Sequence, residues 1–205
     1  MNKRFFVLAM VLVMMVLLVS VAYAEEPANP VTPVTPVAPV ETKAKVTVAT
    51  IYINNAKSTY DDEITKKLTD RFNAKLAMYD LRPGDKYIEK LNKMGVTDVT
   101  TAERADIVQV FTGEGIDYVV YAEVQPPIMK QWVSFFNIGV AATVTIPVKI
   151  LDIKNNKYLY NGKFTEQADN SSMLGGVGTK AAVIKAMDQI LVKTDEILTN
   201  RLPVL

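Results

Sequence analysis

The fold is decided by residues 113–127, which read GEGIDYVVYAEVQPP. Gly113 and Gly115 predict the end of a helix, because glycine without a Cβ is common just past a helix C-terminus. The run from Asp117 to Gln125 is apolar and β-branched enough to predict a buried strand, and the proline pair then ends it. The centre of the chain therefore predicts a helix that leads into a covered strand.

Before this stretch, the sequence predicts a strand from Val46 to Asn54 and then an amphipathic helix. Ser58 or Thr59 is the expected N-cap, and three acids at residues 61–63 suit the positive end of a helix. One face of that helix carries Ile64, Leu68, Phe72, Leu76 and Tyr79. This pattern predicts a helix that packs on a sheet.

Two further helices are predicted between this helix and the central strand. A short strand or extended segment ends at residues 81–84. Asp85 then caps a short helix whose apolar positions are Ile88, Leu91 and Met94, and Gly95 ends it. In the second helix, Thr100 is the expected cap and Glu103 completes a capping box, ahead of Ala105, Val108 and Phe111.

After the central strand, residues 128–141 are expected to form a long loop or a strand extension. A strand follows from about Ala142 to Ile153, and Pro147 within it predicts an edge or bulge position, because proline cannot donate to a ladder. Asn155 and Asn156 predict a hairpin turn, because asparagine tolerates positive φ.

The chain then predicts a returning strand over residues 157–165 and a last helix over about residues 179–201. The apolar positions of that helix are Val183, Ile184, Met187, Ile190, Leu191, Ile197 and Leu198. The expected order is β-α-β-α-α-β-β-β-α. It predicts an α/β (α+β) fold in which a mixed sheet of about five strands is covered by three to four helices.

The first 24 residues have the pattern of a secretory signal peptide. Lys3 and Arg4 precede an apolar run from Phe5 to Val21, and Ala22 and Ala24 suit a cleavage site after Ala24. The alternative is an uncleaved membrane anchor, and in both cases the rest of the chain is exported. We therefore expect a periplasmic, cell-envelope or secreted location.

Without this leader the formal charge changes from +1 to −1. Nucleic acid is not an expected partner, because such a partner needs a clustered basic excess. No later apolar stretch is long enough for a spanning helix.

Residues 25–44 predict a proline-rich, disordered linker, with prolines at 27, 30, 33, 36 and 39. Proline at this spacing favours polyproline II, so the segment is expected to be a semi-rigid tether that reaches roughly 60 Å. The alternative is a ligand for a proline-reading domain. Residues 45–205 then have the size of a single globular domain.

The chain contains no cysteine and no histidine. These absences exclude disulfides, thiolate nucleophiles and imidazole acid/base chemistry, so no metal or cofactor is expected and the chain is not expected to be an enzyme. The enzymatic alternative is a carboxylate-dependent hydrolase of wall glycans, which would pair two of Asp117, Glu123, Asp152 and Glu166.

Two local features are candidate binding sites. Trp132, Phe135, Phe136 and Ile138 either form an exposed partner or membrane surface patch or cover one end of the core. Gly175, Gly176, Gly178 and Lys180 precede the last helix, where free amides could hold an anion, although their spacing does not match a P-loop. The alternative is a flexible lead-in to the helix.

Two motifs carry a resemblance to a known group of envelope domains: residues 115–120, GIDYVV, and residues 150–153, ILDI, followed by the Asn155–Asn156 turn. Over about Lys45 to Gln167 the chain resembles the domain shared by the curli-secretion component CsgG, the penicillin-binding-protein activator LpoB and the amino-terminal domain of TolB. The activator and curli branches are usually lipid-anchored through a cysteine, which this sequence lacks.

The resemblance implies a non-enzymatic accessory module that contacts an envelope protein and regulates cell-wall synthesis or envelope assembly. Oligomerisation is compatible with such a role. The alternatives are a small-ligand (anion) binding module and the wall-glycan hydrolase. Trp132, Phe135 and Phe136 are the expected partner contacts.

Overall fold

The computed structural model describes residues 45–173 and 177–204, so the predicted signal peptide and linker lie outside the described residues. The elements follow one another as β1 (Thr47–Asn54), α2 (Asp61–Lys75), β2 (Asp80–Pro83), α3 (Asp85–Lys93), α4 (Arg104–Phe111), β3 (Tyr118–Val124), β4 (Ile128–Val133), β5 (Ile138–Asp152), β6 (Lys157–Ser172) and α5 (Thr179–Arg201). The predicted fold class, a mixed sheet with helices packed on it, is confirmed.

The described part of the chain contains a six-stranded sheet in which β5 is the organising strand. Strands β2, β1 and β3 lie side by side and are parallel, as the two crossovers require. One edge of β5 pairs with β3 near Asp152 and with β4 near Ile138, and its other edge pairs with β6 along its whole length. The sheet thus continues beyond β3 as a three-stranded arm of β4, β5 and β6.

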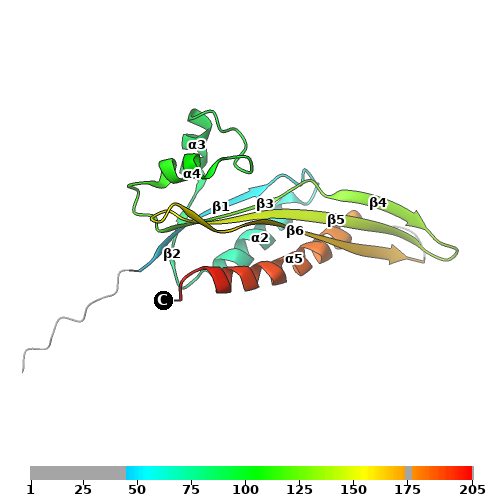
Figure 1. Cartoon of the computed structure of the whole chain (residues 1–205). Coiled ribbons are helices and arrows are strands. Elements are labelled where there is room, and N and C mark those ends of the chain that lie inside the picture. Colours follow the sequence, from blue (N-terminus) through cyan, green and yellow to red (C-terminus); the bar gives the residue numbers. More distant parts are fainter. Residues whose placement is uncertain (1–44, 174–176, 205) are drawn as a thin grey trace, which may run out of the picture. The chain divides into compact units, whose positions relative to one another are not determined.

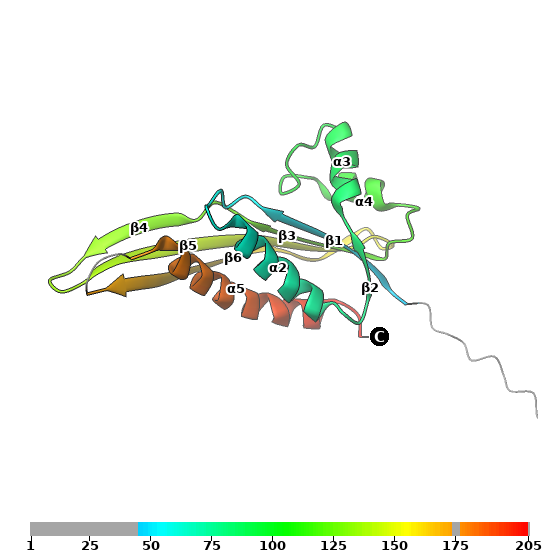
Figure 2. The ribbon, with the colours of Figure 1, turned by 180° about the vertical axis from the view of Figure 1, so that it is seen from behind.

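Helices cover the two faces of the sheet unequally (Figures 1 and 2). Helices α2 and α5 pack on one face, where the core contains Ile64, Leu68, Phe72, Met187 and Ile190. Helices α3 and α4 cover only one end of the opposite face, and the arm extends away from them. The core under α3 and α4 contains Ala49, Ile51, Tyr87, Leu91, Phe111, Tyr121 and Leu151.

The structure corrects the predicted strands after Pro127. Residues 128–133 form the separate strand β4, whereas a long loop or an extension of the next strand was expected. Strand β5 begins at Ile138 rather than near Ala142, and β6 continues to Ser172 rather than ending near Thr165. Pro147 is not at a bulge, since the register shift falls between Ile150 and Leu151. Although β5 is a central strand, Pro147 occupies a stretch of it that is paired on one side only, as an edge position would be. It lies where neither β3 nor β4 pairs with β5, so the missing donor is tolerated there.

The predicted helix caps are also corrected. Neither Ser58 nor Thr59 caps α2; instead, the Asp61 side chain reaches back and accepts hydrogen bonds from the Ser58 amide (2.8 Å) and hydroxyl (2.7 Å). Asp85 is the first residue of α3 rather than its cap, and the capping box of α4 joins Glu103 and Asp106, three residues beyond the predicted pair. By contrast, the Asn155–Asn156 turn and the bounds of α5 are confirmed.

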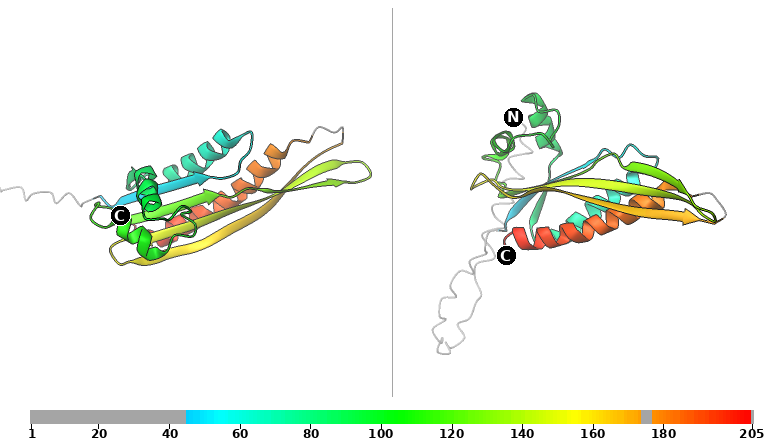
Figure 3. Two further views of the ribbon diagram at one scale, coloured as in Figure 1. Left: turned by 90° about the horizontal axis from the view of Figure 1, so that it is seen from above. Right: turned by 45° about the vertical axis from the view of Figure 1, so that its right-hand side comes forward.

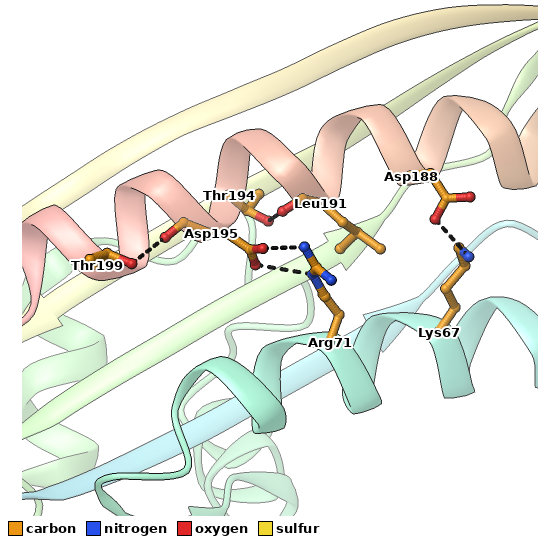
Figure 4. Close-up of polar contacts among 7 residues, drawn as sticks. All are labelled: Lys67, Arg71, Asp188, Leu191, Thr194, Asp195 and Thr199. Atoms are coloured by element: carbon orange, nitrogen blue, oxygen red, sulfur yellow. Dashed lines mark hydrogen bonds and ion pairs between the residues drawn. The ribbon is translucent and has the colours of Figure 1, made fainter.

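Three ion pairs of the described residues join α2 to α5: Glu63 with Lys180, Lys67 with Asp188, and Arg71 with Asp195. Figure 4 shows the last two. Lys67 Nζ lies 2.6 Å from Asp188 Oδ1, and the Arg71 guanidinium contacts both carboxylate oxygens of Asp195. Arg71 is about half exposed and Asp195 is mostly covered. The pair therefore adds to packing that the apolar face of α2 already provides.

Replacing Arg71 with alanine is expected to lower the free energy of unfolding by less than about 1 kcal/mol, because water screens a half-exposed ion pair. Urea denaturation of the single variants and of the Arg71→Ala/Asp195→Ala double variant measures the coupling. A loss above 2 kcal/mol would show instead that the pair holds α2 in place.

Candidate functional site: the tip of the β4–β5 hairpin

The hairpin of β4 and β5 ends in a short, closed turn. Trp132 lies opposite Gly139 and Val133 opposite Ile138, so only residues 134–137 make the turn. The Ser134 amide donates to the Asn137 carbonyl (2.8 Å), and the Asn137 amide donates to the Ser134 hydroxyl (3.2 Å). Phe135 and Phe136 are thus held at the end of an ordered hairpin.

The tip is apolar and open to solvent. The exposed fractions are 92% for Phe135, 70% for Phe136, 77% for Val133 and 48% for Ile138. We call these four residues together with Trp132 the hairpin tip. A patch of large apolar side chains is costly to leave in water and usually marks an interaction site.

Trp132 is half-buried, whereas the other four residues of the hairpin tip are exposed. Its ring lies over Gly139, where an added Cβ would come within 2.3 Å of two ring carbons. The adjacent Phe135 and Phe136 rings make an edge-to-face contact with centroids 4.7 Å apart. The aromatic side chains are therefore arranged by local contacts.

The hairpin carries almost no charge. Between Val124 and Leu151 the sequence contains no acid, and its two cations are Lys130 and Lys149. Lys149 is buried beneath the α3–α4 connection, far along β5 from the tip, so Lys130 is the exposed charge of the hairpin. A charge-poor centre with aromatic side chains is the composition of a protein interface core.

Two alternatives were open for Trp132, Phe135, Phe136 and Ile138. In the structure these residues form an exposed patch and do not cover one end of the core. The tip lies at the end of the arm, remote from α3 and α4 (Figure 1). Met173, which directly follows the β6 residue opposite Ile138, is 75% exposed and extends the apolar surface. A partner contact at this surface stays a prediction.

The four candidate carboxylates each have a structural partner. Asp117 accepts from the Thr47 amide (2.8 Å), Asp152 from the Asn155 amide (2.9 Å), and Glu166 pairs with Lys193 of α5. Glu123 accepts from the Asn55 side chain (2.8 Å) and from the buried Tyr121 hydroxyl.

The sheet register also separates Glu123 from Asp152. Asp152 lies opposite Tyr118 in the β3–β5 ladder, five positions along β3 from Glu123. Asp117 and Asp152 both act on Tyr118, whose pKa is raised mainly by burial and further by these two carboxylates. The cleft of about 530 Å³ beside α3 is lined by Arg82, Lys86, Glu114 and neighbours, and by none of the four carboxylates.

The anion-site hypothesis concerns the start of α5. Gly178 is the N-cap of that helix, and its carbonyl accepts from the Asn170 side chain (3.0 Å). Lys180 forms an ion pair with Glu63 of α2. Gly175 and Gly176 lie outside the described residues, so an anion site here stays a prediction.

Sequence reasoning missed a buried polar cluster under the α3–α4 connection. The Lys149 ammonium donates to the carbonyls of Val99 (3.3 Å), Thr100 (2.5 Å) and Ala102 (3.4 Å), and it is 7% exposed. Burial lowers the pKa of Lys149, and burial together with the Glu123 hydrogen bond raises the pKa of Tyr121. The cluster holds the α3–α4 connection on the sheet, and it is a structural feature.

Comparisons with known proteins give distant likenesses to solved structures. No protein-family profile matches the chain, and no curated protein sequence matches it. Among solved structures, the lipoprotein GNA1162 of Neisseria meningitidis is 16% identical over 72% of this chain and 99% of its own, with a TM-score of 0.39. Chlamydia trachomatis hypothetical protein CT253 is 12% identical over 76% and 98%, with a TM-score of 0.44.

The C-terminal domain of LpoB from Salmonella enterica, one of the proteins that the sequence resembles, is also among the similar structures. It is 13% identical over 59% of this chain and 81% of its own, with a TM-score of 0.33. Within the described residues, no helix is both long and apolar enough to cross a membrane.

Proposed function

We propose that the chain is an exported, non-enzymatic accessory protein of the cell envelope whose hairpin tip docks into an apolar pocket of an envelope protein. The observation that carries this proposal is the exposure of Val133, Phe135 and Phe136 at the end of an ordered hairpin. The leader sequence and the proline-rich segment support an exported domain that acts at a distance from its attachment point.

The chemistry of the tip supports a protein as the partner. Aromatic side chains near the centre of an interface supply much of its binding energy, and the two phenylalanines present contact area with few torsions to immobilise. The long ladders on both sides of β5 hold the hairpin without a partner, so little ordering cost accompanies docking.

Replacing Phe135 and Phe136 together with alanine is expected to abolish specific crosslinking to the partner and to change the free energy of unfolding by less than about 0.5 kcal/mol. The reason is that both side chains are already in water, so their removal costs the folded state little. A photo-crosslinking amino acid at Val133 in the native envelope, followed by identification of the adduct, measures the loss.

The matched control is Val192→Ala, which removes an exposed apolar side chain (63%) from the outer side of α5. It should leave the adduct unchanged. An adduct that persists in the Phe135→Ala/Phe136→Ala variant contradicts the proposal, and so does crosslinking to lipid alone.

A further inference from the structure

The outer edge of β6 is the longest unpaired strand edge in the described part of the chain. Strand β6 has 16 residues and pairs there with β5 alone. Figure 3 shows it along the border of the sheet, with α5 beneath the sheet. Unpaired N–H and C=O groups along such an edge are a template for another strand.

The register shows which residues of β6 direct their backbone groups outward. The Gln125 amide donates to the Thr145 carbonyl (3.0 Å), so the backbone groups of Thr145 face away from β6. Thr165 lies opposite Thr145, and in an antiparallel ladder it then belongs to a pair that exchanges no hydrogen bonds. Thr165, and with it Lys163, Gln167 and Asp169, therefore presents its N–H and C=O groups at the free edge.

The charged residues along this edge are complementary to those of a second, antiparallel copy of the same edge. Lys163 and Asp169 are both exposed, and neither has an ion-pair partner within residues 45–173 and 177–204. They lie three residues on either side of Glu166, and all three belong to a stretch of β6 without a register shift. An antiparallel copy of β6 centred on Glu166 would place each Lys163 opposite an Asp169.

We infer that β6 pairs with β6 of a second copy of this chain across a two-fold axis at Glu166. Lys163 then lies opposite Asp169 of the second copy, and Thr165 lies opposite Gln167 of the second copy, in pairs that exchange two hydrogen bonds each. Opposite charges directly across a ladder stabilise the pairing.

Charge selects this register over its neighbours. Centring on Thr165 would place Lys163 opposite Gln167, and centring on Gln167 would place it opposite Ser171, so neither gains an ion pair. The two Glu166 residues meet at the axis, but their side chains are on the α5 face and each pairs with Lys193 of its own copy. The interface is a single pair of strands, so a weak, reversible dimer is expected.

Charge reversal tests the inference on the full chain by sedimentation equilibrium. In each single variant, Lys163→Glu or Asp169→Lys, residues 163 and 169 carry the same charge, and the two-fold axis brings them opposite each other at two places. Each variant is expected to weaken dimerisation at least about tenfold. The double variant Lys163→Glu/Asp169→Lys restores complementarity and should dimerise like the parent. A parent that stays monomeric up to millimolar concentration, or a double variant as weak as the single ones, overturns the inference.

Disulfide trapping tests the register separately. Because the chain has no cysteine, only the introduced cysteines can form a disulfide. A mixture of Thr165→Cys and Gln167→Cys chains should form a heterodimer under mild oxidation, because these positions lie opposite each other. Each variant alone should crosslink much less. Equal crosslinking of the mixture and of either variant alone contradicts the register, and far-ultraviolet circular dichroism checks that every variant is folded.

Discussion

Replacing Lys149 with alanine is expected to lower the free energy of unfolding by about 3 kcal/mol, the larger part of it from polar groups left without partners. The three N–H donors of the ammonium meet three carbonyl oxygens, those of Val99, Thr100 and Ala102. Alanine would leave these acceptors facing an emptied space beneath the α3–α4 connection. The connection should therefore open more often, because its other hydrogen bonds, such as those from the Thr100 and Thr101 amides to Asp98, are local and do not tie it to the sheet.

Urea denaturation measures the stability loss, and native-state hydrogen exchange shows where it occurs. We expect faster exchange over residues 99–107, which include the first turn of α4, and unchanged exchange in α5. The matched control is Lys130→Ala, because Lys130 is an exposed lysine of β4 and its loss should change stability by less than about 0.5 kcal/mol. A Lys149 variant as stable as the Lys130 variant would refute a structural role for the ammonium.

Much of the fold can be predicted from the sequence, because a buried face requires apolar residues at the spacing of a strand or of a helix. The central strand and the last helix were predicted with nearly their observed bounds, since their apolar positions match a covered strand and an amphipathic helix. Strand β4 was missed for the opposite reason. Ile128, Lys130 and Trp132 alternate with Met129, Gln131 and Val133, so neither face is consistently apolar and no core dictates the pattern.

The candidate site was only half predictable. The cluster of aromatic residues after Pro127 is visible in the sequence, but its exposure depends on the β4–β5 pairing, which local propensity does not reveal. Lys149 carried a weak signal, because it shares a strand face with Leu151, two residues further on, and that face is buried. A lysine at a core-facing strand position indicates that polar acceptors lie above it.

Replacing Gly84 with alanine is expected to lower the free energy of unfolding by about 3 kcal/mol. An added Cβ would lie 2.3 Å from Ile51 Cγ1 and 2.5 Å from the Thr50 carbonyl oxygen. The carbonyl belongs to β1 and accepts from the Gly84 amide (2.8 Å), so the obstacle is backbone that is fixed in the sheet. Gly84 has φ −88°, which any residue adopts, so the cost is steric and not conformational.

Gly139→Ala is the informative comparison, because its Cβ would also meet an atom at 2.3 Å, but on the Trp132 side chain. A ring at an exposed hairpin can rotate away, whereas the Thr50 carbonyl cannot, so Gly139→Ala should cost much less stability than Gly84→Ala. Trp132 is the sole tryptophan of the chain, and its fluorescence should shift to longer wavelength as the ring enters water. If the two alanines cost the same, then the Trp132 ring is held over Gly139 as firmly as the Thr50 carbonyl is held in the sheet.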